Sequence, residues 1–146
     1  MAKRRQTAKG QYEPNNPEKY KGSFPIVYRS SWELTMMRYF DKHPDVSAWA
    51  SETIQIPYMH PVKKKVAMYI PDFFVEYVDK QGNKRQELIE VKPAGQASLK
   101  EAKSTYQKVS LAINTAKWNA AQQWCKNRNL RFRVITENDM FNKPKK

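Results

Sequence analysis

The alternation of hydrophobic and polar residues along the chain separates candidate strands from candidate helices. Trp32, Met36, Tyr39 and Phe40 recur at helical spacing between Ser30 and Pro44, which predicts a helix from residue 30 to about residue 41 with these four side chains on its buried side. Shorter apolar runs predict strands near residues 46–51, 53–58 and 130–136. Residues 99–126 have a helical pattern, and we expect a break near 113–115 because a helix of that full length is unusual in a small domain.

Residues 66–92 have the pattern of a β-hairpin. Asp79-Lys80-Gln81-Gly82-Asn83 is a polar turn between runs of β-branched and aromatic residues. If pairing runs outward symmetrically from Gln81, Asp72 faces Glu90, with Cβ atoms about 4.5–5.5 Å apart. Lys92 shares the face of Glu90, and the other face collects apolar residues that include Tyr69.

The order of these elements predicts an α/β fold of three layers, a mixed central sheet flanked by helices. At 146 residues the chain has room for one domain with one core. Residues 1–22 form a basic, polar stretch that we expect to be a flexible arm, residues 23–141 the folded domain, and residues 142–146 a basic tail.

The net charge of the chain indicates which kinds of molecule it could bind. Lysine and arginine number 27 against 14 aspartates and glutamates, a net charge of +13. Such an excess favours a polyanionic partner, with nucleic acid the commonest, although a basic scaffold protein of a ribosome or virion has the same charge. The single cysteine, Cys125, excludes a disulfide within the chain and favours a reducing cytoplasm. No apolar run has the roughly 18 residues of a membrane span, so we expect no membrane partner.

The two opposed acids, Asp72 and Glu90, are the candidate catalytic or metal-binding residues. Asp72, Glu90 and Lys92 would lie together at one end of a partly buried layer, where each carboxylate needs a positive partner. A divalent ion held by both carboxylates satisfies that need, and so does a structural ion cluster with Lys92 and neighbouring bases. Glu33 lies three residues after Ser30, so it either closes a capping box or turns its carboxylate toward the site.

Basic residues near this hairpin are candidate phosphate contacts. Lys63, Lys64 and Lys65 form a basic loop, which is either a phosphate clamp or a solvated loop. Arg29 and the basic arm, with Lys3, Arg4 and Arg5, are further candidates. No Gly-x-x-x-x-Gly-Lys loop and no Gly-x-Ser-x-Gly motif is present, which argues against a nucleotide-driven motor and against acyl transfer.

Three segments together resemble the PD-(D/E)xK nuclease superfamily: Tyr28–Glu33, Ile70-Pro71-Asp72-Phe73 and Ile89-Glu90-Val91-Lys92-Pro93. Within it, the chain is similar to the branch that contains the cutting subunit of a bacterial transposase and the head completion nucleases of T-even-type phages. The resemblance implies a restriction-endonuclease-like α/β/α fold with a nuclease domain over residues 23–141.

The resemblance also implies roles for residues. Asp72, Glu90 and the backbone carbonyl of Val91 would bind Mg²⁺, with Mn²⁺ possible, while Lys92 would position or polarise the attacking water. Glu33 would be the acid carried by a helix, and Lys117 is the candidate for a second basic residue. The implied activity is Mg²⁺-dependent endonucleolytic cleavage of double-stranded DNA.

The biological setting also follows from the resemblance alone. It implies a protein that acts on the packaged phage head or its DNA ends before tail joining, and that contacts head or neck proteins. Such a protein would occur in the host cytoplasm during assembly and in the virion. The alternative is a non-catalytic basic virion protein that binds DNA and the head portal.

Overall fold

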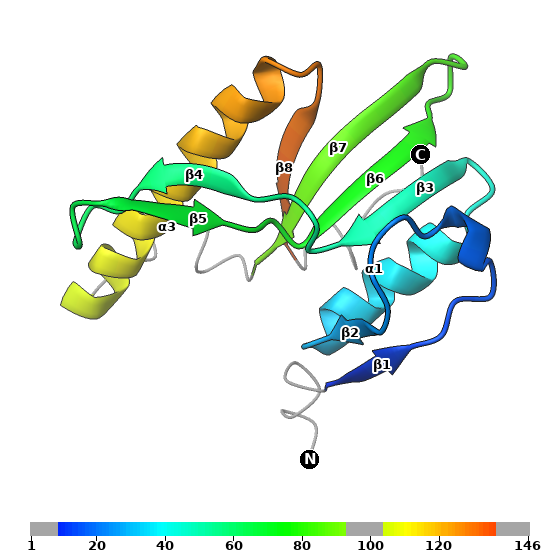
Figure 1. Cartoon of the computed structure of the whole chain (residues 1–146), viewed down its shortest axis with the longest axis horizontal. Coiled ribbons are helices and arrows are strands. Elements are labelled where there is room, and N and C mark those ends of the chain that lie inside the picture. The colour runs from blue at the N-terminus through cyan, green and yellow to red at the C-terminus, as the bar shows by residue number, and fades with distance from the viewer. Residues whose placement is uncertain (1–8, 93–103, 137–146) are drawn as a thin grey trace.

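A computed structural model describes residues 9–92 and 104–136 of the chain (Figure 1). In the first half the elements are β1 (Gly10–Tyr12), a 3-10 helix η2 (Pro17–Lys19), β2 (Ile26–Tyr28), α1 (Ser31–Lys42), β3 (Val46–Ser51) and β4 (Ile56–Met59). In the second half they are β5 (Val66–Tyr69), β6 (Phe73–Val78), β7 (Lys84–Val91), α3 (Thr105–Lys126) and β8 (Arg131–Ile135).

The central sheet is mixed and lies between α1 and α3. Its order is β3-β6-β7-β8, with antiparallel pairs up to β7 and a parallel pair between β7 and β8. Met37 and Phe40 of α1 pack on Trp49, Phe73 and Ile89 on one face, while Ala121 and Cys125 of α3 pack on Leu88 and Phe132 on the other. Because strand residues alternate between faces, β6, β7 and β8 each supply both cores. The predicted three-layer α/β/α fold is confirmed (Figure 1).

The β6–β7 hairpin has the predicted turn and register. Asp79 Oδ1 accepts hydrogen bonds from the amides of Gln81 and Asn83, and Gly82 adopts a positive φ of 85° that suits glycine. Phe73 pairs with Ile89 and Phe74 with Leu88, which is the symmetric pairing expected from a turn centred on Gln81. The next pair outward is Asp72 and Glu90.

The predicted extent of that hairpin is wrong at its start. Residues 66–69 form β5, which pairs with β4 rather than continuing into β6. Pro71 lacks an amide hydrogen and cannot donate to a ladder, so the chain changes direction between Tyr69 and Phe73. As a consequence Tyr69 packs in the core that contains Leu88, on the face opposite to the one predicted. The strand predicted at 53–58 is likewise displaced, to Ile56–Met59.

The two helices differ from expectation in one respect each. Ser30 caps α1 as predicted, accepting the amide of Glu33, but Tyr39 is 54% exposed because it lies off the apolar stripe formed by Met36, Met37 and Phe40. Helix α3 runs for 22 residues without the break expected near 113–115. It contains neither glycine nor proline, and Ser104 and Gln107 close a capping box at its start. In the part of the chain that is described, no helix combines the length and hydropathy needed to cross a bilayer.

Residues 10–20 belong to the folded domain, although we expected them in a flexible arm. Strand β1 pairs with β2, and Tyr20 is buried against Trp49. The connection is made by Asp41, which is fully buried and accepts hydrogen bonds from the Tyr12 hydroxyl at 2.6 Å and from the amides of Asn15 and Asn16. The sequence pattern missed this because a buried carboxylate late in α1 supplies the partners for a polar segment. Lys3, Arg4, Arg5 and the tail 142–146 lie outside the described residues.

Replacing Asp41 with Asn tests this anchor. Burial opposes ionisation of Asp41, but the hydrogen bonds from Tyr12, Asn15 and Asn16 lower the pKa of its carboxyl below the usual value. The amide of Asn would face these donors with donors of its own. We expect Asp41→Asn to lower the free energy of unfolding by about 2–4 kcal/mol at neutral pH, measured by urea denaturation.

The stability difference between wild type and Asp41→Asn should depend on pH. A carboxyl with a lowered pKa in the folded state stabilises the protein above the unfolded-state pKa of about 3.9, and this contribution is lost as the pH falls through the folded-state pKa. The difference between wild type and Asp41→Asn should therefore shrink below about pH 4. A difference independent of pH would show that the Asp41 charge is not what holds residues 12–16.

Candidate active site

Asp72 and Glu90 meet at the end of the central sheet. Asp72 immediately precedes β6, and its Oδ2 accepts the amide of Val91 at 2.8 Å, which joins it to the end of β7. Glu90 lies in β7 and is only 8% exposed. The structure therefore brings the two acids together, as the hairpin pattern predicts.

A third carboxylate, which sequence reasoning missed, extends this row. The amide of Glu52 donates to the carbonyl of Asp72 at 3.0 Å, continuing the β3–β6 register in which Ser51 faces Phe73. Glu52, just after β3, thus lies beside Asp72, just before β6, which in turn adjoins Glu90 in β7. Only the pairing of β3 with β6 brings Glu52 next to Asp72. The pattern of each strand by itself does not predict which strands pair.

Arg29 connects the acids to the start of α1. Its guanidinium forms a close ion pair with Glu52 and lies 3.8 Å from Glu33 Oε2 and 3.9 Å from Asp72 Oδ1. Glu33 Oε1 accepts the amide of Arg29 at 3.0 Å rather than that of Ser30, so Glu33 does not close the capping box considered from the sequence. Its carboxylate instead orients Arg29 at the edge of the acidic row.

Glu90 has two partners of different kinds. Lys92 Nζ lies 3.4 Å from Glu90 Oε2, and the Tyr69 hydroxyl donates to Glu90 Oε1 at 2.8 Å. The amide of Lys92 donates to the carbonyl of Ile135, so β8 fixes the backbone that carries this lysine. Burial, and then the charge of Glu90, raise the pKa of the Tyr69 hydroxyl far above its usual range, which keeps it a donor. Tyr69 was missed because its strand was assigned to the wrong face.

The electrostatics of Asp72 show that the local bases do not balance the acids. Burial and then the charge of Glu90 raise the pKa of the Asp72 carboxyl to about 7, against the opposing effects of the Val91 amide and Arg29. Arg29 lies beyond hydrogen-bond distance of Asp72 Oδ1. Two buried carboxylates that repel each other are what a cation placed between them would stabilise.

The donor set fits a hard divalent ion. Carboxylate and carbonyl oxygens are the ligands that Mg²⁺ prefers, and Mg²⁺ usually combines one or two carboxylates with water and phosphate oxygens. Within residues 9–92 and 104–136, no three His, Cys, Asp or Glu side chains are grouped to hold a metal by themselves. An ion here would therefore rest on Asp72 and Glu90, completed by backbone or solvent oxygens.

Comparison with known proteins gives the family. Residues 43–137 match the family model of the TnsA-like endonuclease N-terminal domain. The head completion nuclease of Enterobacteria phage T4 is 32% identical over 140 residues, which cover 90% of this chain and 92% of that protein. This chain belongs to the TnsA-like endonuclease family. The predicted resemblance to PD-(D/E)xK nucleases, to a transposase subunit and to a phage head completion nuclease is confirmed.

The other predicted residues of this TnsA-like domain lie outside the row of acids. Lys63, Lys64 and Lys65 are exposed in the turn between β4 and β5, away from the carboxylates along the chain. Lys117 Nζ lies 5.7 Å from the ring centre of Tyr69, which places α3 behind the tyrosine that binds Glu90. The match of residues 43–137 includes Asp72, Glu90 and Lys92 but not Arg29 or Glu33.

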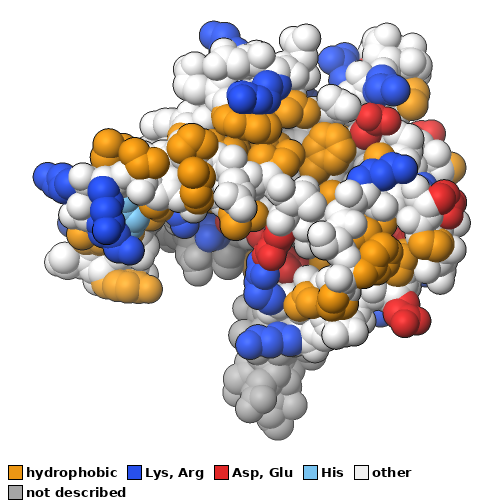
Figure 2. Space-filling model, in the orientation of Figure 1, with side chains coloured by type: hydrophobic (Ala, Val, Ile, Leu, Met, Phe, Trp, Pro, Cys, Tyr) orange, Lys and Arg blue, Asp and Glu red, His pale blue; other side chains and the backbone are white. Residues whose placement is uncertain are grey.

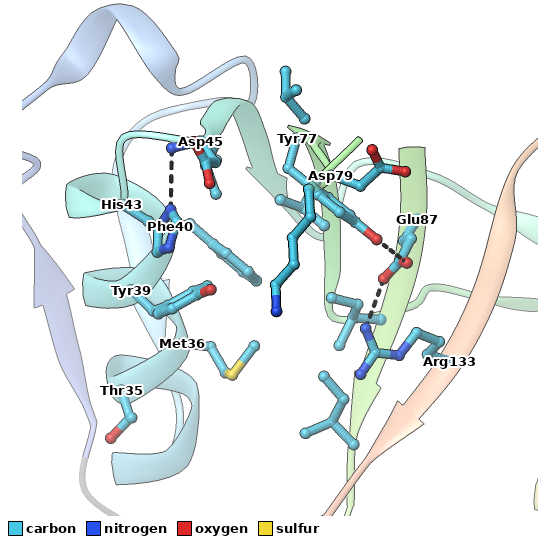
Figure 3. A pocket seen from close by; sticks show the side chains of 16 residues that line it. Thr35, Met36, Tyr39, Phe40, His43, Asp45, Tyr77, Asp79, Glu87 and Arg133 are labelled. Atoms are coloured by element: carbon cyan, nitrogen blue, oxygen red, sulfur yellow. Dashed lines mark hydrogen bonds and ion pairs between the residues drawn. The ribbon is translucent and has the colours of Figure 1, made fainter. Parts of the chain in front are cut away.

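A hollow between α1 and the sheet is separate from this site. It has a volume of about 690 Å³ and lies between α1 and the sheet, lined by residues that include Tyr39, Phe40, Glu87 and Arg133 (Figure 3). Glu87 is buried there and accepts from Tyr77 and, at 3.0 Å, from Arg133. None of the residues that line it carries a predicted catalytic or metal-binding role.

Replacing Glu52 with Gln tests its contribution to the acidic row. The change removes one negative charge and releases Arg29 toward Asp72, and both effects oppose cation binding. We expect the affinity for Mn²⁺, measured by isothermal titration calorimetry, to fall about fivefold. Glu18→Gln, at an exposed acid of η2, is the matched control and should leave the affinity unchanged. Equal Mn²⁺ affinities for wild type and Glu52→Gln would exclude Glu52 from the cation site.

Proposed function

We propose that this protein is a Mg²⁺-dependent endonuclease of double-stranded DNA. The observation that carries the proposal is the convergence of Asp72, Glu90 and Lys92, in which burial and then the charge of Glu90 raise the pKa of Asp72 and an ammonium lies 3.4 Å from Glu90. Membership in an endonuclease family supports the same reaction class.

Each residue has a role in this proposal. Asp72, Glu90 and the carbonyl of Val91 hold the ion, for which Mn²⁺ can substitute because oxygen ligands discriminate weakly between the two. When bound, the ion acidifies a water and neutralises charge on the scissile phosphate. Lys92, fixed to β8 through its amide, faces the reacting phosphate and stabilises the negative charge that develops on it. Glu33 acts through Arg29 and holds that guanidinium beside Glu52 and Asp72.

DNA is held mainly through its phosphates. Arg29 at the site, Lys63, Lys64 and Lys65 on the β4–β5 turn, and Lys3, Arg4 and Arg5 near the N-terminus supply the positive charge, and the net charge of +13 agrees with such a partner. Contacts of this kind do not read base sequence, so we propose a preference for DNA structure or ends over a long recognition sequence.

The biological step is proposed from the T4 relative. The name of that protein, head completion nuclease, supports action on packaged DNA or its ends before heads join tails. This role would place the protein in the host cytoplasm during assembly and then in the virion, in contact with head or neck proteins.

Conservative changes at the acids test the chemistry. Asp72→Asn and Glu90→Gln should each reduce cleavage of supercoiled plasmid in Mg²⁺ by about a thousandfold or more, because the charge that holds the ion is lost. Lys92→Met should reduce it by about a hundredfold or more. Binding of DNA in EDTA, measured by fluorescence anisotropy, should remain close to wild type for all three.

Glu76→Gln is the matched control, since Glu76 lies in β6 outside the row of acids, and it should cleave normally. EDTA should stop the wild-type reaction. Full cleavage by Asp72→Asn would overturn the assignment. DNA binding without cleavage in Mg²⁺ or Mn²⁺ would favour the alternative, a non-catalytic DNA-binding virion protein.

The salt dependence of DNA binding tests the basic loop. Each phosphate contact contributes about −0.9 to the slope of log K against log salt concentration. Changing Lys63, Lys64 and Lys65 together to Ala should make that slope shallower by about 2–3. Changing Lys42 and Lys80 to Ala, on other surfaces, should leave it nearly unchanged. An unaltered slope in the triple variant would identify the three lysines as a solvated loop.

A further inference from the structure

The outer face of the β4–β5 hairpin is apolar and exposed. Met59, Val66 and Met68 are 59%, 60% and 55% exposed. Met59 faces Val66 and Pro57 faces Met68 across the hairpin, so these side chains form one continuous strip. The inner residues Ile56, Tyr58 and Tyr69 are buried against α3, which fixes the face that the strip presents.

This strip contributes nothing to the core of the domain. Adjacent exposed apolar side chains of this kind mark a surface that contacts another molecule. Val62 and Ile70, just outside the two strands, are also apolar and exposed, with 56% and 42% of their surface accessible. The hairpin is therefore a two-sided element, with one side packed on the protein and one side available to a partner.

The charge of the hairpin indicates the partner. Residues 56–70 contain no acid, and Lys63, Lys64 and Lys65 are exposed at its turn. Among the residues that the structure describes, no ion pair involves any of these three lysines. An unneutralised positive end beside an apolar strip complements a polyanion that also carries apolar groups, as duplex DNA does in its grooves.

The hairpin is also tied to the row of acids. Strand β5 leads through Ile70 and Pro71 to Asp72, and Tyr69 on β5 donates to Glu90. Figure 2 shows hydrophobic side chains over the hairpin, basic ones at its tip and acidic ones beyond its base, all on one face of the molecule. Lys64 lies eight positions before Asp72, a span of at most about 25 Å, which corresponds to at most about seven base pairs.

We propose that the outer face of the β4–β5 hairpin lies in the major groove of duplex DNA on one side of the phosphate at the active site. Two strands about 4.8 Å apart with their side chains fit a groove about 12 Å wide. Lys63, Lys64 and Lys65 contact the phosphates at the far end, and the methionine and valine side chains contact thymine methyl groups. The position of the cut relative to this contact rests on the proposed nuclease function, but the DNA contact itself does not.

Binding in EDTA tests the contact without cleavage. The double variant Val66→Thr, Met68→Thr keeps residues that favour strands but makes the strip polar. We expect it to bind a thymine-rich duplex about tenfold more weakly than wild type in fluorescence anisotropy. The slope against salt should not change, because no phosphate contact is lost. Val78→Thr, at an exposed valine of β6, is the matched control and should bind normally.

A change in the DNA isolates the methyl contacts. Replacing every thymine with deoxyuridine removes the methyl group and keeps the phosphates and the base-pair hydrogen bonds. Wild type should lose about fivefold in affinity on this duplex, while the double variant should lose almost nothing. If the variant and wild type bind both duplexes equally, the strip does not contact DNA, and the proposal is overturned.

Sedimentation velocity distinguishes the competing occupant. If the strip joins two copies of the chain, wild type should sediment as a dimer and Val66→Thr, Met68→Thr as a monomer with unchanged DNA affinity, which would also overturn the proposal. A protein that binds DNA through the strip but cleaves nothing in Mg²⁺ would support the DNA contact and reject only the nuclease function.

Discussion

The register of β6 against β7 places two carboxylates opposite each other at a partly covered end of the sheet, and the surrounding structure depends on that placement. Asp72 and Glu90 repel each other, and burial removes the water that would otherwise screen them, so the pKa of Asp72 rises to about 7. Arg29 offsets this repulsion only in part, because its guanidinium pairs closely with Glu52 and lies 3.9 Å from Asp72 Oδ1. The negative charge that remains supports the divalent cation that we propose at this site.

All three layers of the fold contribute to holding this arrangement. The loop before α1 supplies Arg29, oriented by Glu33 at the first turn of the helix. Strand β8 fixes the backbone of Lys92, and the β4–β5 hairpin supplies the Tyr69 hydroxyl to Glu90. The hairpin that carries the exposed apolar strip also carries Tyr69, which donates to Glu90. The surface that we propose for DNA is therefore hydrogen-bonded directly to a proposed metal ligand.

The parts of the site that depend on short-range geometry could be predicted from the local sequence. The Asp79–Asn83 turn sets the hairpin register, and Ser30 starts α1, so the positions of Asp72, Glu90 and Glu33 followed from spacing. Glu52 and Tyr69 could not be found in this way, because they reach the site through the pairing of β3 with β6 and through a change of direction at Pro71. The N-terminal segment was misassigned for the same reason, since Asp41, more than 20 residues away, holds it.

The most direct test is a crystal structure of the protein soaked in Mn²⁺, with data collected at the manganese absorption edge. We expect one anomalous peak between the carboxylates of Asp72 and Glu90, within about 2.0–2.4 Å of an oxygen from each. Lys92 and Arg29 bridging the two acids, with no peak between them or with a peak elsewhere on the chain, would contradict it.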